Sequence, residues 1–326
     1  MEVCGSHTAA IARSGIASLL SPRIRLLHGP GCPVCVAVSS YVDRLVELSL
    51  TDHTCVVTFG DLLRIPGKEG SLLEAKGRGG RVEMVYSPLD VLPLAKAHPE
   101  TTFVFGAVGF ETTAPAYALL MEELTEQEIG NVKLLTALKT MPPVLRRLME
   151  EDPDIDAFLA PGHVSVITGA GLFRPLAEEY QRPFVVAGFS GEDLLVAIHT
   201  CLSLRGKGEV ANCYPSVVTE AGNQKAKALI DRFFEPADGA WRGFGVIPGS
   251  ALLLREKYNS WDAGSADLLK EEELHKGCHC SLILSGKEEP HDCPLFGTAC
   301  TPVHPKGACM VSEEGACASY YRVAPV

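Results

Sequence analysis

The sequence predicts an α/β protein with two similar parallel-sheet domains facing a cleft, followed by a small Cys-rich iron–sulfur domain. Short apolar runs alternate with helix-like stretches over most of the chain. A weak internal repeat recurs at an offset of about 131 residues, and six of the twelve cysteines lie between Cys278 and Cys317. We expect the three domains to be residues 1–118, 119–250 and 251–326.

Composition is that of an ordinary globular protein and argues against several functions. The chain has 326 residues, 46% of them hydrophobic and 21% charged, with a formal net charge of −11. It has no lysine- or arginine-rich block, which argues against nucleic acid and against an anionic membrane surface as partners. It also has no membrane-spanning apolar run and no signal-peptide pattern, so we expect a cytoplasmic protein.

Short apolar runs mark the expected strands, and many of them end in a turn rich in glycine or proline. They are residues 24–27, 55–59, 82–86, 102–108, 132–138, 157–160, 184–187, 216–219 and 244–247. Helix-like patterns lie between most of them, for example over residues 144–150, 194–204 and 224–234. Because ligands bind beyond the carboxyl ends of parallel strands, we expect the turns after these strands to line the cleft.

The motif His-Gly-Pro-Gly-Cys-Pro-Val-Cys at residues 28–35 follows the first expected strand. Its glycines and first proline predict a tight turn, and a helix-like pattern follows. Cys32 is therefore expected at or just before a helix N-terminus, where backbone N–H groups favour a thiolate. Cys32 and Cys35 can close a small disulfide or contribute half of a zinc site, and the strand before and helix after them favour redox chemistry.

Near the start of the chain, Cys4 and His7 stand three residues apart beside a glycine, before a helix-like stretch at residues 8–20. A thiol and an imidazole at this spacing can share a metal or a proton. The alternative is a buried cysteine near a capping histidine. His163, in Pro-Gly-His-Val-Ser, is either a base in the cleft or a packing histidine.

The turn after the most apolar strand carries Glu111, with the hydroxyls of Thr112 and Thr113 beside it. The Glu111 carboxylate could orient His7 or move a proton. The alternative is an ordinary helix N-terminus, with one of the threonines as its cap and Pro115 in its first turn. The two interpretations are compatible.

The C-terminal cysteines lie in loops rich in proline and glycine that cannot build an apolar core of their own, so we expect a metal centre to organise them. Four of them follow the spacing Cys-x14-Cys-x6-Cys-x16-Cys, at Cys278, Cys293, Cys300 and Cys317. Four thiolates suit either a [4Fe–4S] cluster or a zinc ion. The spacing leaves open which four bind, because Cys280 and Cys309 are also present.

Together these motifs resemble the HypD family of [NiFe]-hydrogenase maturation proteins. The resemblance covers essentially the whole chain and rests on five motifs in the family's order: residues 1–8, 28–35, 109–115 and 161–165, and the cysteine tail. It implies a scaffold with redox activity on which the iron centre of the hydrogenase is assembled. It also implies a HypC-type chaperone that helps to hold iron carrying two cyanides and one carbon monoxide, and a HypE-type donor that delivers cyanide as a thiocyanate. The hydrogenase large-subunit precursor is then an indirect partner.

The resemblance also assigns roles to residues. It implies that Cys4 binds the transient iron, with His7 near it, and that Cys32 and Cys35 are the redox pair. It implies a [4Fe–4S] cluster on Cys278, Cys293, Cys300 and Cys317, with Cys280 and Cys309 as non-ligands. The remaining candidates for positioning ligands or moving protons are Glu111 with Thr112 and Thr113, His7 and His163.

Two other functions are compatible with parts of the sequence. The first is a stand-alone thiol–disulfide oxidoreductase with a zinc-stabilised tail, which needs neither iron on Cys4 nor partners. The second is a structural adaptor whose cysteines serve only stability. Metal content distinguishes the first from the scaffold, and partner binding without redox activity favours the second.

Overall fold

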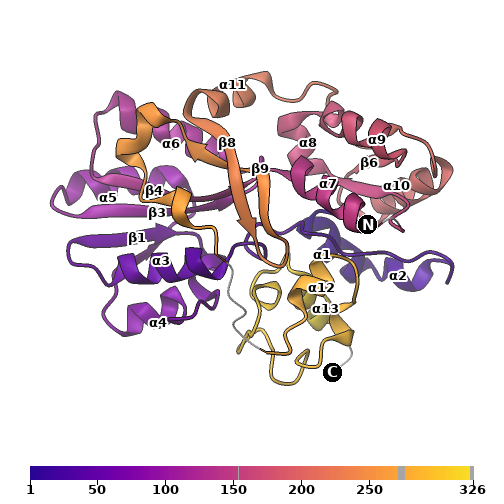
Figure 1. Cartoon of the computed structure of the whole chain (residues 1–326), viewed down its shortest axis with the longest axis horizontal. Coiled ribbons are helices and arrows are strands. Elements are labelled where there is room, and N and C mark those ends of the chain that lie inside the picture. Colours follow the sequence, from indigo (N-terminus) through magenta and orange to yellow (C-terminus); the bar gives the residue numbers. More distant parts are fainter. Residues whose placement is uncertain (153, 271–275, 324–326) are drawn as a thin grey trace. The chain divides into compact units, whose positions relative to one another are not determined.

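The computed structural model describes residues 1–152, 154–270 and 276–323 and has a mixed α/β fold, as the sequence predicts (Figure 1). The chain divides into two compact units, each assembled from separate stretches. Unit 1 comprises Met1–Cys35, Met141–Gln224 and His275–Val326, and unit 2 comprises Val36–Thr140 and Lys225–Leu274.

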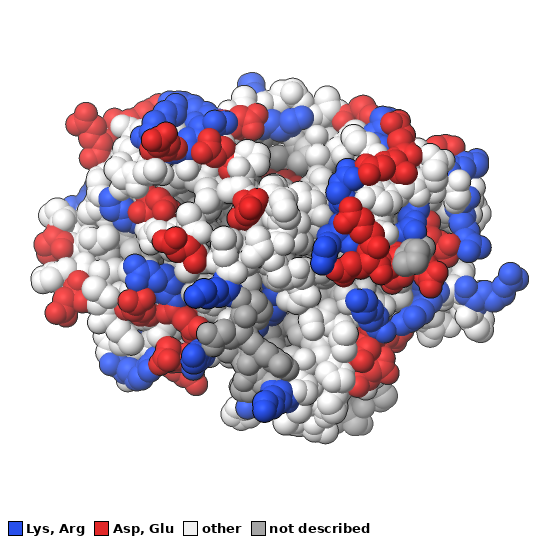
Figure 2. Space-filling model, in the orientation of Figure 1, with Lys and Arg blue, Asp and Glu red and all other residues white. Residues whose placement is uncertain are grey.

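The described residues include no helix long and apolar enough to cross a bilayer. On the face drawn in Figure 2, acidic and basic side chains of the described residues are interspersed.

Unit 2 contains a six-stranded sheet in the order β2-β1-β3-β4-β9-β8. Its strands are β1 (Thr54–Thr58), β2 (Val82–Met84), β3 (Thr102–Gly109), β4 (Val132–Lys139), β8 (Phe234–Trp241) and β9 (Gly245–Leu254). Its helices are α3 (Ser39–Ser49), α4 (Leu72–Gly77), α5 (Val91–Ala97), α6 (Ala114–Glu126) and α11 (Gln224–Phe233). The first four strands in this order are parallel, whereas β9 runs antiparallel to both β4 and β8.

The central strands of this sheet are apolar because both of their faces are buried. Every residue of β1 is buried, and β3 is buried from its second residue to its last. The Phe105 ring of β3 packs edge to face against Phe59 and against Tyr117 of α6, with centroids 5.7 and 5.6 Å away. The buried Tyr117 hydroxyl donates to the Val108 carbonyl at 3.2 Å, so its polar end is satisfied.

Unit 1 contains a smaller, fully parallel sheet in the order β5-β6-β7. Its strands are β5 (Phe158–Pro161), β6 (Phe184–Ala187) and β7 (Val210–Asn212). Its helices are α1 (Gly5–Ser14), α2 (Ile16–Leu19), α7 (Met141–Glu151), α8 (Gly162–Thr168), α9 (Arg174–Tyr180), α10 (Gly191–Ser203), α12 (Cys280–Leu284) and α13 (Ala316–Val323). Helix α10 packs against β5 and β6, and α1 packs against both α10 and α13.

Two of the expected strands are wrong. Residues 24–27 form no strand, and only the following His28 makes an isolated bridge, to Glu2. Residues 216–219 lie in a turn and the segment after it, and the third strand of the unit 1 sheet is instead β7. Of these eight residues only Val218 is buried, so neither run has the burial of an interior strand, and composition alone does not make a short apolar run a strand.

The helix expected directly after Cys32 is also wrong. Residues 33–36 form a turn, and α3 begins only at Ser39. The Cys35 N–H donates to the Cys32 carbonyl at 3.1 Å, which closes a single turn. Cys32 therefore does not lie at the N-terminus of a helix.

The domain boundaries at residues 118 and 250 fall inside α6 and β9, and the two units are discontinuous in sequence. The unit 2 sheet has six strands of mixed direction, whereas the unit 1 sheet has three parallel strands. The division into three domains, with two similar α/β halves, stays a prediction.

Candidate functional site

The first three residues join two segments of unit 1 through backbone hydrogen bonds. Glu2 forms parallel bridges with His28 and with Leu159 of β5. The Glu2 N–H donates to the Leu27 carbonyl at 2.9 Å, and the Gly29 N–H donates to the Glu2 carbonyl at 2.8 Å. This ladder places the start of the chain beside the turn at residues 28–35.

Cys4 directly precedes α1 and is buried. Burial raises the pKa of its thiol to about 12, with smaller contributions from the carboxylates of Glu2 and Glu314. The backbone N–H groups of His7 and Ser6 oppose this shift by hydrogen bonding to the thiolate. Cys4 is therefore a protonated thiol that a metal ion can convert into a thiolate ligand.

His7 and His163 approach the same aromatic side chain. The ring of Phe189 lies 5.0 Å from the His7 ring and stacks on the His163 ring at 4.0 Å. The His7 Nε2 lies 3.3 Å from the Ala187 carbonyl oxygen, while its buried Nδ1 has no hydrogen-bond partner among the described residues. Burial lowers the pKa of His7, so its ring is held neutral and can accept a proton or bind a metal.

Glu2 contributes a buried carboxylate that contacts Cys4, Thr8 and His28. Its side chain is fully buried and accepts hydrogen bonds from the Cys4 N–H at 3.0 Å and the Thr8 hydroxyl at 2.5 Å. It also lies 3.0 Å from the Nδ1 of His28, the first residue of the motif at residues 28–35. One carboxylate thus connects the Cys4 segment, helix α1 and the turn that leads to Cys32.

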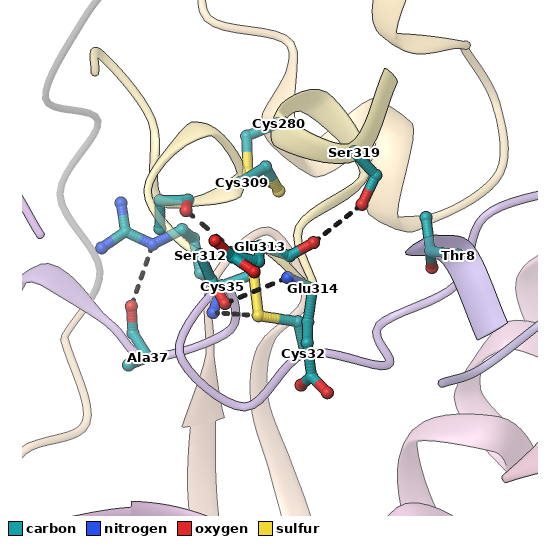
Figure 3. Close-up of a disulfide and its surroundings, with 12 residues drawn as sticks. Thr8, Cys32, Cys35, Ala37, Cys280, Cys309, Ser312, Glu313, Glu314 and Ser319 are labelled. Carbon is teal, nitrogen blue, oxygen red and sulfur yellow. Dashed lines mark hydrogen bonds between the residues drawn. A yellow bond between two sulfur atoms is a disulfide. The ribbon is translucent and has the colours of Figure 1, made fainter. Parts of the chain in front are cut away.

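Cys32 and Cys35 form a buried disulfide with a Cα–Cα distance of 5.3 Å (Figure 3). The turn that carries it packs directly on the Cys4 segment. The Gly5 N–H donates to the Gly31 carbonyl at 3.0 Å, and a Cβ on Gly31 would lie 2.3 Å from the Cys4 nitrogen. Only glycine allows this approach of two backbones.

The six C-terminal cysteines all line one small cavity, together with Leu295, Phe296, Gly307 and Met310. Five of the six thiols are buried, and Cys278 is partly exposed. Burial and the neighbouring thiols raise the pKa of Cys278 to about 12. The predicted ligands Cys278, Cys293, Cys300 and Cys317 therefore face the same space, and so do the predicted non-ligands.

Cys280 and Cys309 form a pair within this group. Their sulfur atoms are 2.8 Å apart, and the hydrogen bond between them is the largest cause that raises the pKa of Cys309. The residue before Cys309 reaches the disulfide: the Ala308 carbonyl oxygen lies 3.9 Å from the Cys35 sulfur. In the view of Figure 3, the Cys280 and Cys309 side chains are drawn above the disulfide.

The donor set of this cavity suits an iron–sulfur cluster. Among the described residues, no three His, Cys, Asp or Glu side chains are grouped to hold a single metal ion. However, the cavity is lined by six thiols and no charged side chain, which is the soft donor set that iron–sulfur clusters use. A Cβ on Gly307 would lie 2.8 Å from the Cys278 sulfur, so glycine there leaves space beside that thiol.

Glu111, Thr112 and Thr113 lie in unit 2, between β3 and α6, and Glu111 is buried. Pro115 stands in the first turn of α6, as the ordinary helix-start interpretation predicts. Thr113 precedes the helix but makes no side-chain capping bond, and its hydroxyl lies 3.5 Å from that of Thr112. A role of Glu111 toward His7 stays a prediction.

Sequence reasoning missed the roles of three residues. Glu2, Thr8 and His28 all stand inside the motifs, but none carries a signal that it is buried or paired. The burial of Glu2 beside His28 depends on the bridge between residues 26 apart, which no local pattern reveals.

Comparison with known proteins identifies the family. The HypD family model, described as "Hydrogenase formation hypA family", matches residues 1–324. The hydrogenase maturation factor HypD of Escherichia coli is 42% identical over 328 residues, covering 99% of this chain and 88% of that protein. A putative hydrogenase expression/formation protein of Methanocaldococcus jannaschii is 41% identical over 326 residues, covering 99% and 91%. HypD of Cupriavidus necator is 39% identical over 334 residues, covering 98% and 88%.

We expect Glu2→Gln to destabilise the protein by about 1–3 kcal/mol. The NH₂ group of the carboxamide would face a buried donor whose hydrogen bond the carboxylate now accepts. Urea denaturation at neutral pH measures the change. Glu126→Gln, at an exposed carboxylate of α6, is the control and should change stability by less than about 0.5 kcal/mol. Equal effects of the two substitutions would contradict the role given to Glu2.

We expect Gly31→Ala to cost about 1–3 kcal/mol, because the added methyl group meets the Cys4 backbone, which cannot move aside as a side chain can. The measurement is the midpoint of urea denaturation. Gly130→Ala is the matched control, since a Cβ there meets nothing within 4 Å. A Gly31→Ala protein as stable as this control would show that the two backbones are not in close contact.

Proposed function

The chain belongs to the HypD family of hydrogenase maturation factors, and from this premise we propose that it is the redox scaffold on which the iron centre of a [NiFe] hydrogenase is assembled. The cargo is an iron that receives two cyanides and one carbon monoxide. The observation that carries the proposal is the contact between the Cys4 segment and the turn of the Cys32–Cys35 disulfide, through the 3.0 Å Gly5–Gly31 hydrogen bond. A soft thiolate ligand and a two-electron couple are thus available on adjoining backbone.

Cys4 is the proposed ligand for the cargo iron. Its thiol loses its proton to become a ligand, and the backbone N–H groups of Ser6 and His7 stabilise the resulting thiolate. His7, whose buried Nδ1 has no hydrogen-bond partner among the described residues, and His163, which stacks on Phe189, are the proposed groups that position diatomic ligands or accept protons.

The Cys32–Cys35 pair supplies the electrons for cyanide transfer. When a thiocyanate on the donor's thiol is cleaved, its S–CN bond takes up two electrons and gives cyanide and a thiolate. Oxidation of the two thiols of Cys32 and Cys35 to the disulfide releases two electrons and two protons. One proton goes to the donor's thiolate and the other is released, so atoms and charge balance.

The disulfide must then be reduced for another cycle. A [4Fe–4S] cluster on Cys278, Cys293, Cys300 and Cys317 would supply electrons one at a time. The 3.9 Å contact between the Cys35 sulfur and the Ala308 carbonyl supports this part of the proposal, because it links the disulfide to the segment that carries Cys309.

The proposal includes further expectations that follow from membership of the family. The partners are a HypC-type chaperone and a HypE-type cyanide donor, with the hydrogenase large-subunit precursor as indirect recipient. Glu111, Thr112 and Thr113 are proposed to position ligands or move protons, and the tail is proposed to form an iron–sulfur domain next to two similar α/β halves. We propose that the protein functions in the cytoplasm, where the thiols of this chain would be kept reduced.

We expect Cys32→Ser to abolish cofactor assembly while the fold and cluster remain, because a serine cannot form the disulfide. The protein is purified without oxygen beside its chaperone partner, and infrared spectra are recorded for cyanide and carbonyl stretches. Cys213→Ser is the control, at a partly exposed cysteine of the same unit, and should keep the stretches. Cyanide and carbonyl stretches in the infrared spectrum of the Cys32→Ser protein would contradict the dithiol role.

We expect the wild-type protein to contain about four iron and four sulfide per chain. The Cys317→Ser variant should lose most of both, and the Cys280→Ser variant should keep them. The two cysteines line the same cavity and are both buried, so burial alone predicts similar effects. Iron, sulfide and zinc analysis measures the outcome. Zinc in place of iron would favour the alternative, a thiol–disulfide oxidoreductase with a structural zinc tail.

A further inference from the structure

Phe189 contacts two histidines of unit 1 that differ in exposure. The ring centroid of Phe189 lies 5.0 Å from that of His7, which belongs to α1, and 4.0 Å from that of His163, which belongs to α8. His7 is 0% exposed, whereas His163 is exposed and Phe189 itself is half-buried. The Phe189 ring therefore reaches from the molecular surface to the buried imidazole.

The position of the Phe189 ring is fixed by its neighbours. Phe189 follows the last residue of β6 closely, and the Tyr214 ring packs edge to face against it with centroids 6.1 Å apart. A Cβ on Gly162 would lie 3.2 Å from the Phe189 Cζ and 2.5 Å from the Ala187 carbonyl oxygen. Only glycine leaves this space at the start of α8. These contacts hold the ring at the carboxyl ends of β5 and β6.

The buried imidazole of His7 keeps one nitrogen atom free. Its Nε2 lies 3.3 Å from the Ala187 carbonyl oxygen, which can only accept, so Nε2 carries the hydrogen of the neutral ring. Nδ1 then has a lone pair, and this atom is buried with no hydrogen-bond partner among the described residues. Because a water molecule at Nδ1 would satisfy the lone pair, the group that excludes water decides whether the lone pair stays available.

We propose that Phe189 is a positioning residue of the iron site, whose ring shields the His7 imidazole from water. The inference rests on the proposed function, which gives the free Nδ1 a use: it accepts a proton or contacts a diatomic ligand when the cargo iron is bound to Cys4. A water molecule bound to Nδ1 would have to be displaced first, and its displacement would cost free energy. His163 is exposed and so lacks such a shield.

The experiment measures how fast each histidine is acylated by diethyl pyrocarbonate at neutral pH, in the full-length protein without cargo iron or partners. Mass spectrometry of the peptides reports each imidazole separately. His163 and the exposed His98 should react at similar rates, and His7 at least about tenfold more slowly, because a buried group reacts only when the structure opens locally. A wild-type His7 that reacts as fast as His163 would overturn the proposal without any variant.

Removal of the ring should expose His7 selectively. In Phe189→Ala the acylation rate of His7 should rise about tenfold, whereas that of His98 should change by less than about twofold. Phe189→Leu keeps much of the apolar bulk and should restore most of the protection. Tyr180→Ala is the matched control, at a half-buried aromatic residue that precedes β6, and should leave the His7 rate unchanged.

His28 distinguishes shielding from a general loss of stability. It is also buried, at 2% exposure, and it has no printed ring contact with Phe189 but packs against Tyr320. Its acylation rate should stay low in Phe189→Ala. Equal rises at His28 and His7, or a His7 rate equal to that in Tyr180→Ala, would overturn the proposal.

Infrared spectra of the same proteins beside the chaperone partner separate this inference from the proposed function. We expect weaker cyanide and carbonyl stretches in Phe189→Ala than in Tyr180→Ala, because water then competes at His7. Absence of these stretches in the wild type would contradict the proposed function. An unchanged His7 acylation rate in Phe189→Ala would contradict the shielding alone.

Discussion

The buried Glu2 carboxylate is the interaction on which the proposed centre of unit 1 depends. It accepts from the Cys4 N–H and the Thr8 hydroxyl and lies 3.0 Å from His28 Nδ1. A carboxylate is costly to bury unless its lone pairs are used, and here three donors surround it. Its position therefore holds the Cys4 segment and the turn before Cys32 together, at the contact where Gly31 leaves no space for a side chain.

The C-terminal cysteines differ from Glu2. Their thiols lie together, and no described residue that lines their cavity carries a charge that would neutralise a thiolate. Six thiols line one small cavity, and burial together with the neighbouring thiols raises the pKa of Cys278 and of Cys317. Thiolates at these positions repel one another, so they become favourable only when a cationic centre binds them. Under the proposed function, a metal centre held by four of these thiols would therefore organise this segment together with its buried side chains Ile283, Leu284, Met310 and Val311.

Sequence reasoning succeeded where a feature is local. The parallel strands β1, β3, β4, β5 and β6 follow from apolar runs bounded by turns, and the Cys32–Cys35 disulfide follows from the Cys-x-x-Cys spacing. It failed at residues 24–27 and 216–219, two short apolar runs that form no strand and of which only Val218 is buried. It also failed after Cys32, where a helix-like pattern is interrupted by a turn that the Cys35 N–H closes.

The sequence by itself determined the family, the α/β class and which cysteines are candidates, because motifs and periodicity are properties of neighbouring residues. Only the tertiary structure decided that Glu2 lies against His28 and that the Cys35 sulfur lies 3.9 Å from the Ala308 carbonyl oxygen. These facts depend on contacts between residues 26 and 273 positions apart. Burial and pairing at such separations arise from how the elements pack, and no local pattern encodes them.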